Sequence, residues 1–68
     1  MITLASRLKE LRLSKEWTQK QIAEQLNITR EAYALYETEK NKPPIDTLIK
    51  IADIYHVSLD YLTGRYKE

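Results

Sequence analysis

Apolar side chains recur along the chain with the spacing of one helix face, and short polar connections separate the stretches. The pattern predicts helices over residues 4–15, 19–26, 30–38, 45–55 and 59–63. In the first of these, Leu4, Leu8 and Leu11 share the inner face, whereas Arg7 and Lys9 belong to the opposite, polar face. A single glycine and two prolines agree with a mostly helical chain.

Residues that commonly cap helices stand at the predicted helix ends. The expected N-terminal caps are Thr3, Thr18, Thr29 and Ser58. Thr18 and Gln21 have the spacing of a capping box, in which two free backbone donors are satisfied. Asn27 tolerates the left-handed conformation that ends a helix, and Gly64 is expected to close the last helix.

The stretch from Thr18 to Tyr36 has the pattern of two short helices joined by a tight turn. The first helix has three apolar residues on one face, Ile22, Ala23 and Leu26. The inner face of the second is expected to consist of Ala32, Tyr33 and Tyr36. Two helices this short cross closely only where a small residue lies at the contact, and Ala23 is that residue. This is the helix-turn-helix arrangement, whose second helix is suited to a DNA major groove.

Composition excludes several other classes of protein. The 68 residues include 11 basic and 10 acidic side chains, so the net charge of +1 argues neither for nor against a nucleic-acid partner. With no cysteine and one histidine, no metal or other cofactor is expected. There is no nucleophile paired with a base and no glycine-rich phosphate loop, so we expect a protein that is not an enzyme. Neither a membrane span nor a secretion leader is visible, which favours the cytoplasm.

Nearly the whole chain resembles the phage repressor and Cro family of DNA-binding domains, also called the XRE family. The resemblance is carried by RLKELR, WTQKQIAEQL, NITREAYALYE, PPIDTLIKIADIY and VSLDYLTG. It implies an all-α, compact five-helix fold like that of lambda repressor, as a single domain over residues 1–68 with its core at 4–64 and a tail at 65–68. The family usually has glycine near Glu16 and Glu39. We therefore expect the backbone to differ at Glu16, and Asn41 to take the turn after the third helix.

The outer face of the third helix is expected to contact bases. The candidate residues are Gln19, Thr29, Arg30, Glu31, Ala34 and Leu35. Arg30 can bind guanine O6 and N7 with two hydrogen bonds. Glu31 either accepts from cytosine N4 or holds Arg30 in place. Leu35 either contacts a thymine methyl group or lies on a partner surface.

A second group of residues is expected to contact the DNA backbone. Its members are Thr18, Lys20, Thr38, Lys40, Asn41 and Lys42. Free N–H groups over residues 18–20 form a helix start suited to phosphate. For the lysines after the third helix, the alternative is a solvated loop. The resemblance also implies that Gln19 braces Arg30, and that Arg12 and Glu37 form a partly buried structural salt bridge.

The resemblance implies that the protein acts as a homodimer on double-stranded DNA, with no small-molecule ligand evident. The candidate dimer residues are Leu59, Tyr61, Leu62 and Tyr66, although Leu59 and Leu62 could instead close the core. The chain is expected to be a sequence-specific transcriptional regulator, and a repressor of palindromic operators. The alternative is a protein-interaction module of the same fold, similar to an antitoxin.

Overall fold

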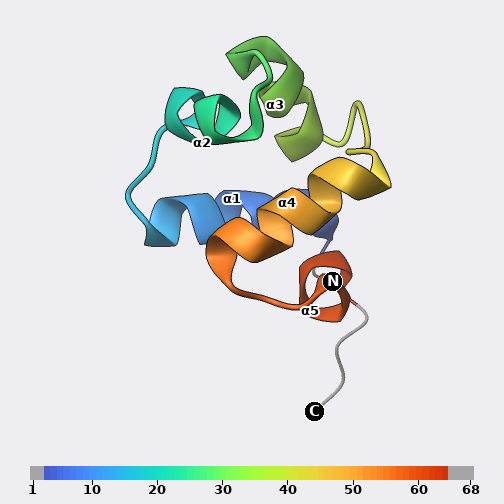
Figure 1. Ribbon diagram of the computed structural model, residues 1–68. Coiled ribbons are helices and arrows are strands. Elements are labelled where there is room, and N and C mark those ends of the chain that lie inside the picture. The colour runs from blue at the N-terminus through green and yellow to red at the C-terminus, as the bar shows by residue number, and fades with distance from the viewer. Residues whose placement is uncertain (1–2, 65–68) are drawn as a thin grey trace.

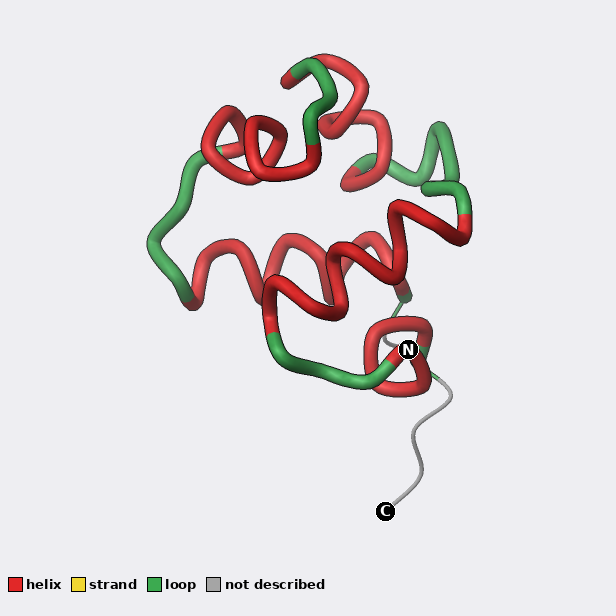
Figure 2. The backbone as a smooth tube through the Cα atoms, viewed as in Figure 1, coloured by secondary structure: helices red, strands yellow, loops and turns green. Residues whose placement is uncertain are grey.

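The computed structural model describes residues 3–64, which form helices joined by short loops (Figure 2). The helices are α1 (Leu4–Ser14), α2 (Gln19–Leu26), α3 (Arg30–Glu37), α4 (Ile45–Tyr55) and α5 (Leu59–Thr63). In Figure 1, α2 and α3 lie together on one side of α1 and α4, and α5 packs near the opposite side. The predicted all-α fold with five helices is therefore confirmed, with helix ends within one residue of those expected.

The α1–α2, α2–α3 and α4–α5 connections share one local structure. Each contains one residue in the left-handed conformation, namely Glu16, Asn27 and His56, with φ of 59°, 58° and 56°. The N–H of the following apolar residue then donates to a carbonyl five residues earlier, from Trp17 to Arg12, Ile28 to Ala23 and Val57 to Ala52. This hydrogen bond satisfies a free carbonyl at the helix end. The apolar residue packs against the core, and the next residue caps the following helix.

The two expectations drawn from missing glycines are wrong. Glu16 keeps the left-handed conformation, so the backbone does not differ there. After α3 the turn is taken by Glu39, with φ of 64°, and not by Asn41. The reason is that the N–H groups of Lys40 and Asn41 both donate to the Leu35 carbonyl, at 3.1 and 3.2 Å, which requires the turn at residue 39. A left-handed residue other than glycine costs about 1 kcal/mol.

All five helices contribute to one buried cluster, which includes Leu8, Ile22, Tyr33, Ile51 and Leu62. Trp17 is partly buried against this cluster, with its ring centre 5.6 Å from that of Tyr55. The assignment of Arg7 to the polar face of α1 is wrong. Its side chain is buried, because α5 packs against that side of α1.

Candidate nucleic-acid interface

The α2–α3 corner is built by local hydrogen bonds and one small side chain. Ala23 is almost fully buried where the helices meet. Asn27 adopts φ 58° and ψ 40°, and the N–H of Ile28 donates to the Ala23 carbonyl at 3.1 Å. Thr29 then caps α3 by accepting from the N–H of Ala32 at 3.1 Å. The corner therefore fixes the direction of α3 relative to α2.

The outer face of α3 carries the side chains expected to contact bases. Tyr33 and Tyr36 face the core, with ring centres 6.1 Å apart, as expected for the inner face of α3. Arg30, Glu31 and Leu35 are exposed, and Ala34 is partly buried beside them. Leu35 is 40% exposed, so its side chain lies on the same outer face as Arg30 and Glu31.

Gln19, at the start of α2, connects both ends of α3. Its Nε2 donates to Glu37 Oε1 at 3.2 Å, and its Oε1 accepts from Arg30 Nη1 at 3.4 Å. Arg30 also lies 3.7 Å from Glu31 in an exposed ion pair. The structure therefore shows the contact by which Gln19 braces Arg30, and it also shows Glu31 near the same guanidinium.

The Arg12–Glu37 ion pair joins α1 to α3 beneath the outer face of α3. Arg12 Nε donates to Glu37 Oε2 at 2.8 Å and Arg12 Nη2 to Oε1 at 3.1 Å. The third nitrogen, Nη1, donates to the Trp17 carbonyl at 2.9 Å. The side chains are 11% and 4% exposed, so the charges are largely withdrawn from water. Sequence reasoning did not find that Glu37 also binds Gln19, because the residues are far apart in the chain.

The Glu37 carboxyl is held in its charged form. Burial alone would raise its pKa, but the hydrogen bonds and charge of Arg12 oppose this and lower the pKa below 4.5. The Tyr33 hydroxyl and the Gln19 amide act in the same direction. The hydrogen bond to Glu37, and then its negative charge, raise the pKa of Arg12. Both groups are therefore ionised at neutral pH.

The start of α2 differs in one respect from the expectation of free N–H groups over residues 18–20. The N–H of Thr18 donates to Gln21 Oε1 at 2.8 Å, so it is not free. The reason is the capping box, in which the Thr18 hydroxyl also accepts from the N–H of Gln21. The N–H groups of Gln19 and Lys20 remain as the candidates for a phosphate at this helix start.

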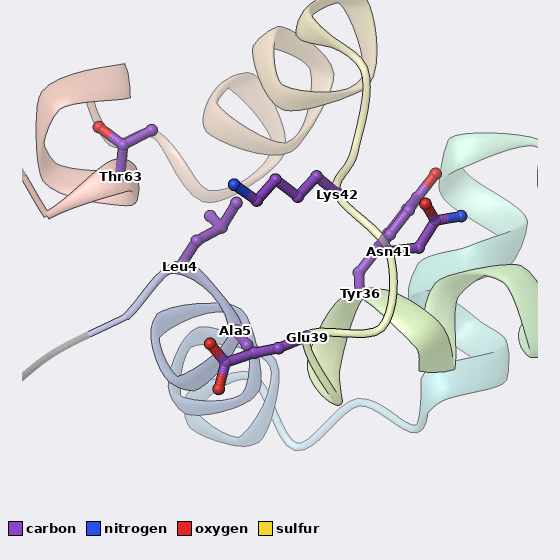
Figure 3. Close-up of a pocket in the computed structure, with 7 residues that line it drawn as sticks. All are labelled: Leu4, Ala5, Tyr36, Glu39, Asn41, Lys42 and Thr63. Atoms are coloured by element: carbon purple, nitrogen blue, oxygen red, sulfur yellow. The ribbon is translucent and has the colours of Figure 1, made fainter.

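The loop after α3 carries the other candidates for phosphate contact, and Thr38, Lys40, Asn41 and Lys42 are all exposed. A pocket of about 370 Å³ lies beside this loop (Figure 3) and is lined by Leu4, Ala5, Tyr36, Glu39, Asn41, Lys42 and Thr63. In Figure 3 the Lys42 side chain extends toward Leu4 and Thr63. A phosphate contact by Lys42 therefore requires its side chain to turn away from the pocket. The pocket adjoins the C-terminal end of α3, whereas Arg30 is at the other end.

The dimer candidates are not equally accessible. Leu62 is 0% exposed and cannot line a dimer interface, because it completes the core under α1. Leu59 is partly buried against the core, and the Tyr61 ring is covered by Arg7. Tyr66 lies outside the described residues. Sequence reasoning missed the more exposed apolar side chains of Leu13, Ile45 and Ile49.

Within residues 3–64, no helix is long and apolar enough to cross a membrane. The same residues hold no cluster of three histidine, cysteine or carboxylate side chains placed to bind a metal ion.

Comparison with known proteins matches residues 8–62 to the helix-turn-helix family model. The transcriptional regulator ImmR of Bacillus subtilis is 44% identical over 64 residues, which cover 94% of this chain and 50% of ImmR. The cryptic phage CTXphi transcriptional repressor RstR of Vibrio cholerae is 35% identical, over 93% of this chain and 56% of RstR. The chain thus spans about half the length of the curated relatives it matches.

Among solved structures, a transcriptional regulator from Listeria innocua is similar to the chain, with a TM-score of 0.89 and 35% identity. The match covers 98% of this chain and 64% of that protein.

Proposed function

Since the chain belongs to the XRE-type helix-turn-helix family, we propose that it binds double-stranded DNA through α3 and regulates transcription. The observation that carries the proposal is the outward position of Arg30 at the start of a helix whose opposite face is locked into the core. Sequence is read by side chains that reach base edges in the major groove. A rigid helix with an exposed arginine at its first residue meets that requirement.

We assign direct base contact to Gln19, Thr29, Arg30, Glu31, Ala34 and Leu35. Arg30 would bind a guanine, and Leu35 would contact a thymine methyl group. Contact with the backbone is assigned to Thr18, Lys20, Thr38, Lys40, Asn41 and Lys42. Of its cations, Lys20 lies in the first turn of α2, and Lys40 and Lys42 lie in the loop after α3, where they would neutralise phosphates.

The proposal extends to repression by a dimer on a palindromic operator. A single α3 reads few base pairs, and two copies related by a two-fold axis would read two half-sites about one helical turn apart. The relative RstR is named as a repressor, whereas BcrR of Enterococcus faecalis, 38% identical, is named as an activator. Repression by occlusion of a promoter is the direction that we propose. A reporter gene placed under the preferred binding site tests the direction of regulation. Repression predicts lower expression of the reporter, and activation predicts higher expression.

Selection of bound duplexes from a random pool tests DNA recognition directly. We expect enrichment of one palindromic sequence, with affinity that falls linearly on a log–log plot against salt. A selection that enriches no sequence would contradict sequence-specific binding. Enrichment of a single, unrepeated half-site would contradict the dimer but leave recognition by α3 intact.

The alternative is a protein-interaction module, in which the exposed Leu35 of α3 would contact another protein. Under that alternative, affinity for duplex DNA would be weak and would not change on replacing Arg30. Titration of duplex DNA with the parent chain and with a variant that lacks Arg30 therefore separates the two functions.

A further inference from the structure

The buried carboxylate of Glu37 lies one hydrogen bond away from the residue that braces Arg30. Gln19 Nε2 donates to Glu37 Oε1 at 3.2 Å, and Gln19 Oε1 accepts from Arg30 Nη1 at 3.4 Å. Glu37 ends α3 and Arg30 begins it, so the amide of α2 connects the two ends of the proposed recognition helix. Glu37 itself is turned inward, with its side chain 4% exposed, and does not face the groove.

The charge on Glu37 decides which way the Gln19 amide points. An ionised carboxylate only accepts hydrogen bonds, so it must face the NH2 group of the amide. The carbonyl oxygen is then directed at Arg30, which only donates. If the amide were reversed, its oxygen would face the carboxylate and its NH2 group would face the guanidinium, and both contacts would be repulsive. Arg12 keeps Glu37 in this state through hydrogen bonds of 2.8 and 3.1 Å.

We propose that Glu37 is a positioning residue for base recognition, and that it acts on Arg30 through the oriented amide of Gln19. The Arg30 guanidinium has two neighbours at once: its Nη1 donates to the Gln19 carbonyl on α2, and its Nη2 lies 3.7 Å from the exposed Glu31 carboxylate. With the amide fixed, Arg30 is held toward α2. Without that restraint, only the exposed contact with Glu31 remains, and the approach of the guanidinium to a base is no longer defined. This inference rests on the proposed function.

The Glu37→Gln variant removes the charge but keeps the size of the side chain and an acceptor for Arg12. We expect it to bind random duplexes about as well as the parent chain. Discrimination at the base pair read by Arg30 should fall from roughly tenfold to about threefold. A merely structural role for Glu37 predicts instead that specific and random duplexes weaken together and that the discrimination ratio does not change. That result would overturn the inference.

A double-mutant cycle identifies the route through Gln19. Gln19→Met keeps the Arg12–Glu37 pair and removes the amide, so it should lower discrimination at the same base pair. In the Gln19→Met background, Glu37→Gln should have no further effect, because coupled residues are not additive. Additive losses would show that Glu37 does not act through Gln19.

The Gln19→Met variant also keeps the test decisive if Glu37→Gln does not fold. Unchanged discrimination at the Arg30 base pair in folded Gln19→Met would overturn the inference by itself. Failure of the proposed function is a different result, because the parent chain would then discriminate between no duplexes at all.

Discussion

The guanidinium carbon of Arg7 lies 3.8 Å from the centre of the Tyr61 ring, so a buried cation on α1 covers an aromatic side chain of α5. The Arg7 Nε makes no hydrogen bond within the part of the chain that the structure describes. Attraction between the cation and the negative face of the ring offsets part of the cost of burying this charge. The contact fixes α5, the shortest helix, against α1.

Replacing Arg7 by Ala should therefore lower the free energy of unfolding by about 1–2 kcal/mol, through lost cation–π attraction and lost packing of the aliphatic stem. Urea unfolding measures the change. Lys9→Ala is the matched control, because Lys9 is exposed on the same helix and should change stability by no more than about 0.5 kcal/mol. Equal effects of the two substitutions would contradict the role given to the Arg7–Tyr61 contact.

Glycine at either left-handed glutamate should stabilise the fold. Glu16 and Glu39 have φ of 59° and 64°, where a side chain is unfavourable. Glycine removes that strain but loses more chain entropy on folding, so the net gain should be about 0.5–1 kcal/mol. Thermal unfolding of Glu39→Gly and Glu16→Gly measures it. Glu10→Gly within α1 is the control and should destabilise by about 1 kcal/mol.

Stability should fall in acid because of Glu37. Its pKa in the folded chain is lowered from the ordinary 4.5. The carboxylate therefore contributes stability that is fully present above pH 4.5 and is lost as the pH falls through the lowered value. Urea unfolding between pH 7 and pH 3 measures this loss. Glu37→Gln should show a smaller decline over the same range, and parallel curves for the two proteins would exclude Glu37 as a cause.

Tyr55→Phe should increase stability, most clearly in alkali. The Tyr55 hydroxyl is buried without a hydrogen-bond partner in residues 3–64, and removing such a group typically gains about 1 kcal/mol. Burial also raises the pKa of Tyr55 from 10.0 to about 12. Above pH 10 the hydroxyl ionises in the unfolded chain but stays neutral in the folded chain, so stability falls as the pH rises toward 12.

Unfolding of the Tyr55→Phe variant at pH 7 and pH 11 tests both effects. Tyr36→Phe, in the same core, controls for a general effect of removing a phenolic hydroxyl. A Tyr55→Phe variant that is less stable than the parent at both pH values would show that the hydroxyl has a stabilising partner.

Arg30→Ala and Lys40→Ala should weaken DNA binding in different ways. Loss of Arg30 should cost about 1–3 kcal/mol on the selected site and relax the preference at one base pair. Loss of Lys40 should weaken binding to all duplexes alike and reduce the salt slope by about one. Electrophoretic mobility shifts at several salt concentrations compare the two. If both variants lose affinity equally on selected and random duplexes, Arg30 does not read a base.

Much of the fold was predictable because its signals are local. The cap of α2 is formed by Thr18 and Gln21, three residues apart. The tight turn is formed by Asn27 and Ile28, whose backbone bonds reach no further than Ala23. Both features therefore follow from residues close together in the sequence. The outward position of Arg30 was predictable for the same reason, since helical periodicity places it opposite Tyr33 and Tyr36. These features were determined by the sequence by itself.

Tertiary structure decided the features that depend on which helices meet. Periodicity alone could place neither Arg7 in the interior nor Leu62 wholly within the core, because burial there depends on how α5 packs on α1. The Glu37–Gln19–Arg30 connection likewise needs residues 18 and 11 positions apart to converge. Periodicity describes the faces of one helix at a time, whereas burial and long-range hydrogen bonds arise only when faces from different helices come into contact.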